Sequence, residues 1–182
     1  MAENPADAFK PGKVAVLLPA GGSSLRFSSS APITFSSPVA DTRWMSLKQY
    51  QSVGERHVPL LVHTIKAFAS VSWISHVVLM VREGLVESTH ALLAAHLYGS
   101  ACQVIVKAGS ETRHRTIYGG MKEISSWTEK PSIVIVHDVV RPLIDEATCR
   151  LVVEAAAKYG VSCLQKSLRN SDAMTNFSDL NF

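Results

Sequence analysis

The 182-residue sequence has few cysteines, little net charge and no long apolar run. Its three cysteines, Cys102, Cys149 and Cys163, cannot form a disulfide framework, and no CxxC pair or Cys/His cluster predicts zinc. No segment approaches the roughly 18 consecutive apolar residues of a membrane span. The acidic, polar start, residues 1–7, resembles neither a secretory signal nor an Arg-rich transit peptide. We therefore expect a cytosolic protein with no membrane partner.

The chain also has only a small excess of positive over negative charge. Lys and Arg total 18 and Asp and Glu total 15, which leaves a net charge of +3. Nucleic-acid-binding proteins usually carry a clustered basic face, so no nucleic-acid partner is expected. A few cations gathered in one pocket can still bind a small anionic ligand. Hydrophobic residues make up 47% of the chain, enough for a sizeable core, which argues against global disorder.

Apolar runs alternate with helix-like stretches through the middle of the chain. Runs typical of strands buried on both faces lie at 13–19, 76–81, 103–107 and 132–136. Helices are expected after Pro59, at 86–97, at 113–124, and from an N-cap at Asp145 to Tyr159, with Gly160 as a stop. The alternation predicts an α/β domain with a mostly parallel sheet over residues 13–160.

Spacing also predicts which helix faces turn inward and which segments lie outside the domain. Two apolar triplets at helical spacing should face the core: Leu61, Ile65 and Phe68, and Ile117, Met121 and Ile124. Residues 1–12 are expected to be flexible, and the Ser-rich stretch 28–46 to be a loop insertion. Residues 161–182 are expected to form a divergent tail that completes no further βαβ unit, although 161–164 could begin a fifth strand.

A turn of small residues, Ala20-Gly21-Gly22, directly follows the first predicted strand. Small residues let backbone N–H groups approach a phosphate, and Arg26 could then grip phosphate oxygens with its planar guanidinium. The alternative is an ordinary turn that joins a strand to a loop. The pattern is not GxGxxG, because Ser24 takes the third glycine position, and it lacks the GxxxxGK[ST] spacing of a P-loop.

Two further cationic segments follow along the chain. Lys48, in Lys-Gln-Tyr, could neutralise a triphosphate, but a single lysine is more often a solvated surface group. Gly109 leads into a predicted helix start that carries Arg113 and Arg115. The N-terminal end of a helix favours acidic side chains, so two arginines there are awkward unless an anion shares the site. An anion site and a plain surface both remain open.

The fourth segment, Val-His-Asp-Val-Val-Arg-Pro at 136–142, follows the last predicted strand. An aspartate just past a buried strand lies where α/β sheets bind ligands, and Asp138 could hold Mg²⁺ against phosphates. The alternative is a turn aspartate paired with Arg141. Because parallel strands end at the same edge of a sheet, the four segments should converge in one cationic crevice. A magnesium–nucleoside triphosphate would fit such a crevice.

The motifs LPAGG…R, KQY, G…TRHRT and VHDxxRP, in this order and spacing, resemble the IspD-type cytidylyltransferases over about residues 13–160. The resemblance implies a Rossmann-like three-layer nucleotidyltransferase fold, here incomplete at the C-terminus. Bacterial and plastid members act on 2-C-methyl-D-erythritol 4-phosphate in isoprenoid synthesis. Animal members resemble ribitol-5-phosphate cytidylyltransferases, which make CDP-ribitol for dystroglycan glycosylation. LPAGG and TRHRT look closer to the animal type, so D-ribitol 5-phosphate is the expected acceptor and methylerythritol phosphate the alternative.

The resemblance also implies a role for each motif residue. A sugar-phosphate oxygen attacks the α-phosphorus of CTP and pyrophosphate leaves, while Arg26 and Lys48 stabilise the transition state. The residues implied in nucleotide binding are Ala20, Gly21 and Gly22 through their backbone, Gly109, Arg113 and Thr116 around the cytidine, and Asp138 through Mg²⁺. Arg141 is implied as a brace for the aspartate turn.

The sequence departs from the family pattern around its first two motifs. Ser24 replaces a glycine, and Phe27 replaces the methionine that usually follows the arginine. Arg26 and Lys48 are 22 positions apart, because residues 28–46 lengthen a short family loop, and Leu47 replaces a proline. Long surface insertions cost little closure entropy, so Lys48 can still reach the site, but we expect its placement to be less preorganised.

The family's acceptor-binding residues, its late lysine and its dimerisation arm cannot be placed on residues 161–182. The family therefore suggests a homodimer, but this chain is expected to be truncated or alternatively spliced and to lack the arm. A catalytically silent CTP-binding isoform is the second hypothesis. A third is an NAD-dependent enzyme with Glu83 on the ribose, which the glycine pattern disfavours.

Overall fold

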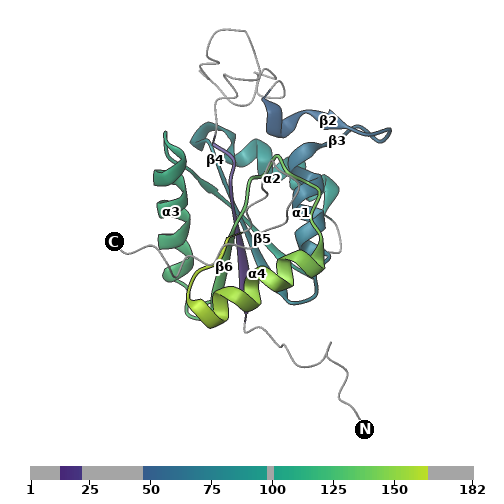
Figure 1. Ribbon diagram of the computed structural model, residues 1–182. Coiled ribbons are helices and arrows are strands. Elements are labelled where there is room, and N and C mark those ends of the chain that lie inside the picture. Colours follow the sequence, from purple (N-terminus) through teal and green to yellow (C-terminus); the bar gives the residue numbers. More distant parts are fainter. Residues whose placement is uncertain (1–12, 22–46, 98–100, 164–182) are drawn as a thin grey trace, which may run out of the picture.

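The computed structural model describes residues 13–21, 47–97 and 101–163 of the chain (Figure 1). Its main sheet has the strand order β5-β4-β1-β6, and every pair is parallel. The strands are β1 Val14–Pro19, β4 Ile74–Val81, β5 Gln103–Ala108 and β6 Ile133–Val136. The predicted parallel sheet is confirmed, and all four of its described strands overlap the apolar runs that predicted them.

Helices follow the strands as the sequence indicates. They are α1 Leu60–Ala69, α2 Val86–His96, α3 Arg113–Ser125 and α4 Glu146–Tyr159. Asp145 caps α4, since its carboxylate accepts the Thr148 N–H at 2.8 Å, and Gly160 ends it at φ +83°. Two short 3-10 helices, η2 Lys48–Tyr50 and η3 Glu83–Leu85, were not predicted from the sequence, nor was a small antiparallel hairpin, β2 Ser52–Val53 with β3 Val58–Pro59.

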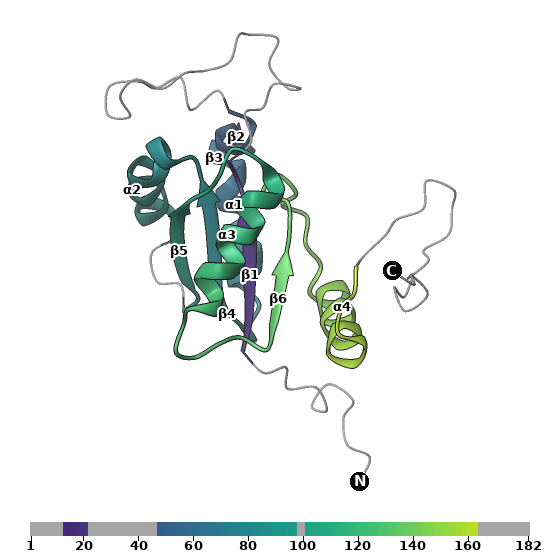
Figure 2. The ribbon, with the colours of Figure 1, turned by 90° about the vertical axis from the view of Figure 1, so that its left-hand side faces the viewer.

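The domain has three layers, with α3 on one face of the sheet and α1, α2 and α4 on the other (Figures 1 and 2). Successive β1 side chains alternate between the two faces. Val16 and Leu18 join the larger core on the α1 and α2 side, whereas Leu17 packs in a smaller core with Val78 on the α3 side. Helices therefore cover both faces of the sheet, as expected for strands buried on both faces.

The predicted inward face of α3 is confirmed only in part. Ile124 is buried and Ile117 packs against the smaller core, but Met121 is 39% exposed, and Thr116 and Gly120 are the other buried residues. The reason is the close approach of α3 to β1. A Cβ at Gly120 would lie 2.4 Å from Leu17 Cδ1, so only a glycine lets the helix pack at this distance. Apolar spacing gives small residues no weight, so it included Met121 and missed Thr116 and Gly120.

Other expectations about the ends of the domain have mixed outcomes. Residues 161–163 form no strand, and Leu164 lies outside the described residues, as do the predicted flexible segment 1–12 and loop 28–46. In the described sheet β6 is an edge strand, with β1 as its neighbour on one side. No helix in the described parts of the chain is long and apolar enough to span a membrane.

Candidate functional site

Most of the predicted site residues lie at the carboxyl edge of the sheet, where β1, β4, β5 and β6 end. The described ones are Ala20, Gly21, Lys48, Gly109, Arg113, Thr116, Asp138 and Arg141. Gly22 and Arg26 lie outside the described residues, so their roles stay predictions. Close contacts among the described residues link the four motif segments to one another, as expected for residues that follow parallel strands.

The turn after β1 meets the turn after β5. The Thr116 hydroxyl donates to the Ser110 carbonyl and accepts the Ser110 N–H, both at 3.0 Å, and Thr116 is only 2% exposed. A Cβ on Gly21 would lie 3.6 Å from Ser110 O, and one on Gly109 would lie 3.0 Å from Thr116 Cγ2. The backbones of the first and third motifs therefore approach closely, and at Gly109 a side chain would force Thr116 to move.

The Lys-Gln-Tyr turn is held against the turn after β1 by buried contacts. Gln49 Nε2 donates to the Ala20 carbonyl at 2.8 Å, and the Tyr50 hydroxyl lies 2.8 Å from Thr89 Oγ1. Leu47 is 1% exposed in the core, whereas Lys48 is exposed. The expectation that Lys48 is poorly preorganised is not supported for its backbone, because the anchors lie within the turn and not in the long loop before it.

Burial also explains why Tyr50 serves as an anchor. Desolvation raises its pKa to about 12, against the lowering effects of the Thr89 hydrogen bond and the Arg82 charge. The phenol therefore stays neutral at physiological pH and keeps its proton for hydrogen bonding. Tyr50 is a structural support of the turn that presents Lys48.

Arg113, Asp138 and Arg141 form a charged cluster at the end of β6. Arg113 Nη1 lies 2.6 Å from Asp138 Oδ1, and Arg141 Nε lies 3.2 Å from Asp138 Oδ2. The Asp138 side chain is 30% exposed, and the two arginine side chains are 57% and 74% exposed. The Asp138–Arg141 pair that the sequence offered as an alternative to metal binding is present. The Arg113 pair links the third and fourth motifs.

The backbone of the turn after β6 is tied down on its inner side. Thr64 Oγ1 of α1 donates to the Val139 carbonyl at 2.7 Å, and Thr64 is fully buried. The Arg141 N–H donates to the Asp138 carbonyl at 3.0 Å, and His137 Nε2 lies 2.9 Å from the Arg141 carbonyl. These contacts fix the direction in which Asp138 leaves the sheet.

Sequence reasoning missed three residues that shape the site: Gln49, Thr64 and Arg82. Arg82 directly follows β4, and its Nε donates to the Gly21 carbonyl at 3.2 Å. The neighbouring Glu83, which the dinucleotide hypothesis required, is exposed at the start of η3. The signal that could have identified Arg82 is its position just past a buried strand, the same signal that pointed to Asp138.

The residues at the end of β6 fit a magnesium ion only in part. The described residues contain no group of three or more His, Cys, Asp or Glu side chains that could hold a metal by themselves. Mg²⁺ commonly uses one or two carboxylates and completes its coordination with water and substrate phosphates, and Asp138 could supply one such ligand. Both Asp138 oxygens contact guanidinium groups, so an ion there would have to share or displace one of them.

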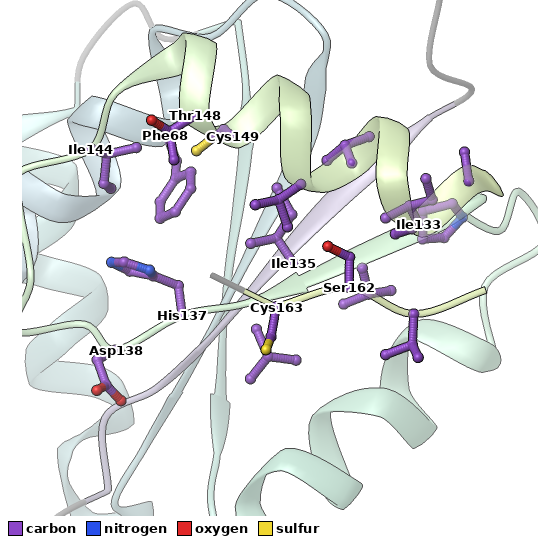
Figure 3. A pocket seen from close by; sticks show the side chains of 18 of the residues that line it. Phe68, Ile133, Ile135, His137, Asp138, Ile144, Thr148, Cys149, Ser162 and Cys163 are labelled. Carbon is purple, nitrogen blue, oxygen red and sulfur yellow. The ribbon is translucent and has the colours of Figure 1, made fainter. Parts of the chain in front are cut away.

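A groove of about 1290 Å³ starts at Arg113 and Asp138 and continues along β6 beneath α4 (Figure 3). The His137 and Phe68 rings pack edge to face on the same side of the groove as Asp138, at the left in Figure 3, with centroids 5.1 Å apart. Ile133 and Ile135 of β6 give it an apolar wall. The charged crevice therefore opens on its β6 side into a less polar space.

Comparisons with known proteins agree with this geometry. The family profile described as "IspD: 2-C-methyl-D-erythritol 4-phosphate cytidylyltransferase" matches residues 14–177. The D-ribitol-5-phosphate cytidylyltransferase of Xenopus tropicalis is 35% identical over 157 residues, covering 83% of this chain and 33% of the relative. The human protein of the same description is 32% identical, covering 84% and 30%.

Bacterial relatives are nearly as similar. The 2-C-methyl-D-erythritol 4-phosphate cytidylyltransferase of Acidobacterium capsulatum is 30% identical over 150 residues, or 82% of this chain and 56% of the relative. The crystal structure of 4-diphosphocytidyl-2C-methyl-D-erythritol synthase from Anaerococcus prevotii matches with a TM-score of 0.56 and 18% identity, covering 91% of this chain and 64% of that one. The chain thus spans about a third of the length of its animal relatives and just over half of the bacterial one.

Proposed function

The chain belongs to the IspD family of cytidylyltransferases, and from this premise we propose that it transfers CMP from CTP to a sugar-alcohol phosphate. An oxygen of the acceptor phosphate attacks the α-phosphorus of CTP, and the bond between that phosphorus and the bridging oxygen breaks. The products are a CDP-alcohol and pyrophosphate, which keeps the β- and γ-phosphates. Such a reaction needs positioning and charge neutralisation more than covalent participation of the protein.

The observation that carries the proposal is the joining of the four motif segments at one edge of the sheet. The Gln49–Ala20 hydrogen bond joins the second segment to the first, and the Arg113–Asp138 ion pair joins the third to the fourth. The crevice gathers cationic groups around a turn of small residues, which suits a triphosphate. The family assignment supports cytidine as its base.

We assign a role in this reaction to each candidate site residue. Lys48, with Arg26 from outside the described residues, neutralises charge on the phosphates during transfer. Gly109 and Thr116 shape the turn against which cytidine lies, and Arg113 borders it. Asp138 would hold Mg²⁺, which would supply further charge neutralisation at the phosphates, and Arg141 would brace the turn.

We propose D-ribitol 5-phosphate as the acceptor, because the animal relatives with that description are up to 35% identical to this chain. Methylerythritol phosphate is the alternative, since a bacterial relative is 30% identical. Pyrophosphate release from CTP and Mg²⁺, with each acceptor in a parallel reaction, separates the two. Release with one acceptor names the substrate.

The matched variants for this test are Lys48→Ala and Lys66→Ala. Lys48 lies in the turn at the site, whereas Lys66 is an exposed lysine in the last turn of α1. Losing a charge that stabilises the transition state should lower kcat/KM by about 100-fold or more, and the Lys66 change should leave it within about twofold. Equal rates for both variants would contradict the role of Lys48.

A second candidate is a CTP-binding chain without transferase activity. It is favoured by the position of β6, which has no outer neighbour among the described strands. CTP binding by the folded chain without pyrophosphate release for either acceptor would support this candidate. Turnover would exclude it.

A further inference from the structure

Two side chains from different elements bind the carbonyl groups of the turn after β1. Gln49 Nε2 donates to the Ala20 carbonyl at 2.8 Å, and Arg82 Nε donates to the Gly21 carbonyl at 3.2 Å. The Ala20 N–H donates to the Met80 carbonyl of β4 at 2.7 Å. Both described carbonyls of this turn, those of Ala20 and Gly21, therefore accept hydrogen bonds from side chains.

This arrangement fixes the direction of a backbone donor. The described chain has no cis peptide bond, and in a planar trans peptide the C=O and the following N–H point in opposite directions. Because the Ala20 carbonyl is directed at Gln49, the Gly21 N–H is directed away from it. In the described parts of the chain no acceptor receives the Gly21 N–H. A backbone N–H with this geometry is suited to an incoming anion.

The same glutamine also holds the turn that carries Lys48. Gln49 is 4% exposed, and its neighbour Lys48 is exposed. The Tyr50 N–H donates to the Leu47 carbonyl at 2.9 Å, which closes the turn around both residues. A buried hydrogen bond from the Gln49 side chain therefore connects the turn that carries Lys48 to the backbone of the glycine turn.

We propose that Gln49 is a positioning residue for the triphosphate, acting through both the Gly21 N–H and Lys48. The inference rests on the proposed function, because it takes the anion to be the triphosphate of CTP. The competing explanation is a buried amide that only stabilises the fold. Removing the Gln49 amide would leave the Ala20 carbonyl without its donor, so stability alone cannot separate the two explanations.

The test compares Gln49→Met with Tyr50→Phe. Methionine keeps the length and the burial of the side chain but donates no hydrogen bond. Tyr50→Phe removes a buried side-chain hydrogen bond of the same turn, the one to Thr89, but keeps the ring that packs in the core, so the turn stays anchored. The change at Gln49 should weaken CTP affinity by about tenfold, equivalent to one hydrogen bond, and Tyr50→Phe by less than about twofold. Equal weakening by both variants would overturn the inference.

Combining each variant with Lys48→Ala tests whether Gln49 acts through the lysine. Coupled residues give non-additive effects, so the loss of CTP affinity caused by Gln49→Met should shrink in the Lys48→Ala background. The loss caused by Tyr50→Phe should be the same in both backgrounds. Additive effects for Gln49→Met would contradict a shared task and favour a purely structural amide.

Hydrogen exchange of the free protein separates failure of this inference from failure of the proposed function. In Gln49→Met, amides of the segments around Gly21 and Lys48 should exchange at least about tenfold faster, while those of α2 keep their protection. If the wild-type chain binds no CTP, the proposed function fails, and the exchange result still decides whether Gln49 joins the two turns. Unchanged exchange at both turns would overturn the inference in either case.

Discussion

β1 is an inner strand of the sheet, whereas β6 and α4 form one flank of the domain (Figure 2), and these two regions are packed very differently. Residues 14–18 of β1 are fully buried, whereas every residue of β6 is at least partly exposed and Val136 is 42% exposed. In α4 only Val153 is buried. The glycine turn and Lys48 are therefore anchored on the well-packed part, and Asp138 and Arg141 on the flank.

The contrast shows that the two sides of the crevice depend on different kinds of contact. The β1 side is held by a continuous apolar core together with buried hydrogen bonds such as Gln49–Ala20. The β6 side has fewer buried apolar residues, Val139 among them, and is also held by polar contacts such as Thr64–Val139 and the hydrogen bond from Trp73 Nε1 to Glu146 Oε1 at 3.0 Å. Regions with few buried apolar contacts open more easily, so local opening should begin at the flank.

The largest effect is expected when the same valine-to-alanine substitution is made in two adjacent strands, β1 and β6. Val16→Ala, at a fully buried position of β1, should cost about 2–3 kcal/mol of unfolding free energy. Val134→Ala, at a half-buried position of β6, should cost less than about 1 kcal/mol. Urea unfolding followed by circular dichroism measures both. Equal costs would show that the flank is as tightly packed as the β1 side.

The next largest effect is expected at the hydrogen bond from Thr64 of α1 to the Val139 carbonyl, in the turn after β6. Thr64→Val keeps the side-chain shape but removes the donor to the Val139 carbonyl, which should cost about 1–2 kcal/mol. Exchange of the amides at residues 137–141 should rise together with this loss, because the turn loses its inner support. Thr128→Val, at an exposed threonine, serves as the control and should change stability by less than about 0.5 kcal/mol. Unchanged exchange in Thr64→Val would mean that other contacts hold the turn.

The smallest effect is a pH dependence confined to the flank. Hydrogen bonds from the Thr148 side chain and backbone lower the pKa of Asp145 below its ordinary value of 3.8. A lowered pKa means that the charged cap stabilises the fold at neutral pH and that this contribution is lost as the pH falls below 3.8. At pH 7, Asp145→Ala should therefore unfold at a lower temperature than the wild type.

The difference between the wild type and Asp145→Ala should disappear in acid. Asp145→Asn keeps a capping side chain without a titrating group, so it should lose less stability and show none of this pH dependence. A constant difference between Asp145→Ala and the wild type from pH 7 to pH 3 would assign the effect to something other than the carboxylate.

Several features could be predicted because they depend on neighbouring residues alone. Unbroken apolar runs indicated β1, β4, β5 and β6, and Asp145 and Gly160 marked the ends of α4. The position of motif residues after the strands predicted a shared crevice, because parallel strands end at one edge. Features that depend on distant contacts were missed, as with Gln49 and Arg82, or wrong, as with the inward position of Met121 in α3.

The sequence by itself determined the alternation of strands and helices, the family and the set of charged residues available to the site. Only the tertiary structure decided that Asp138 pairs with both Arg113 and Arg141, that Gly120 lets α3 approach Leu17, and that Gln49 holds the first turn. The physical reason is the separation along the chain between the residues that interact. Local patterns express the preferences of neighbouring residues, whereas these contacts join residues far apart in the chain that meet only after the sheet has formed.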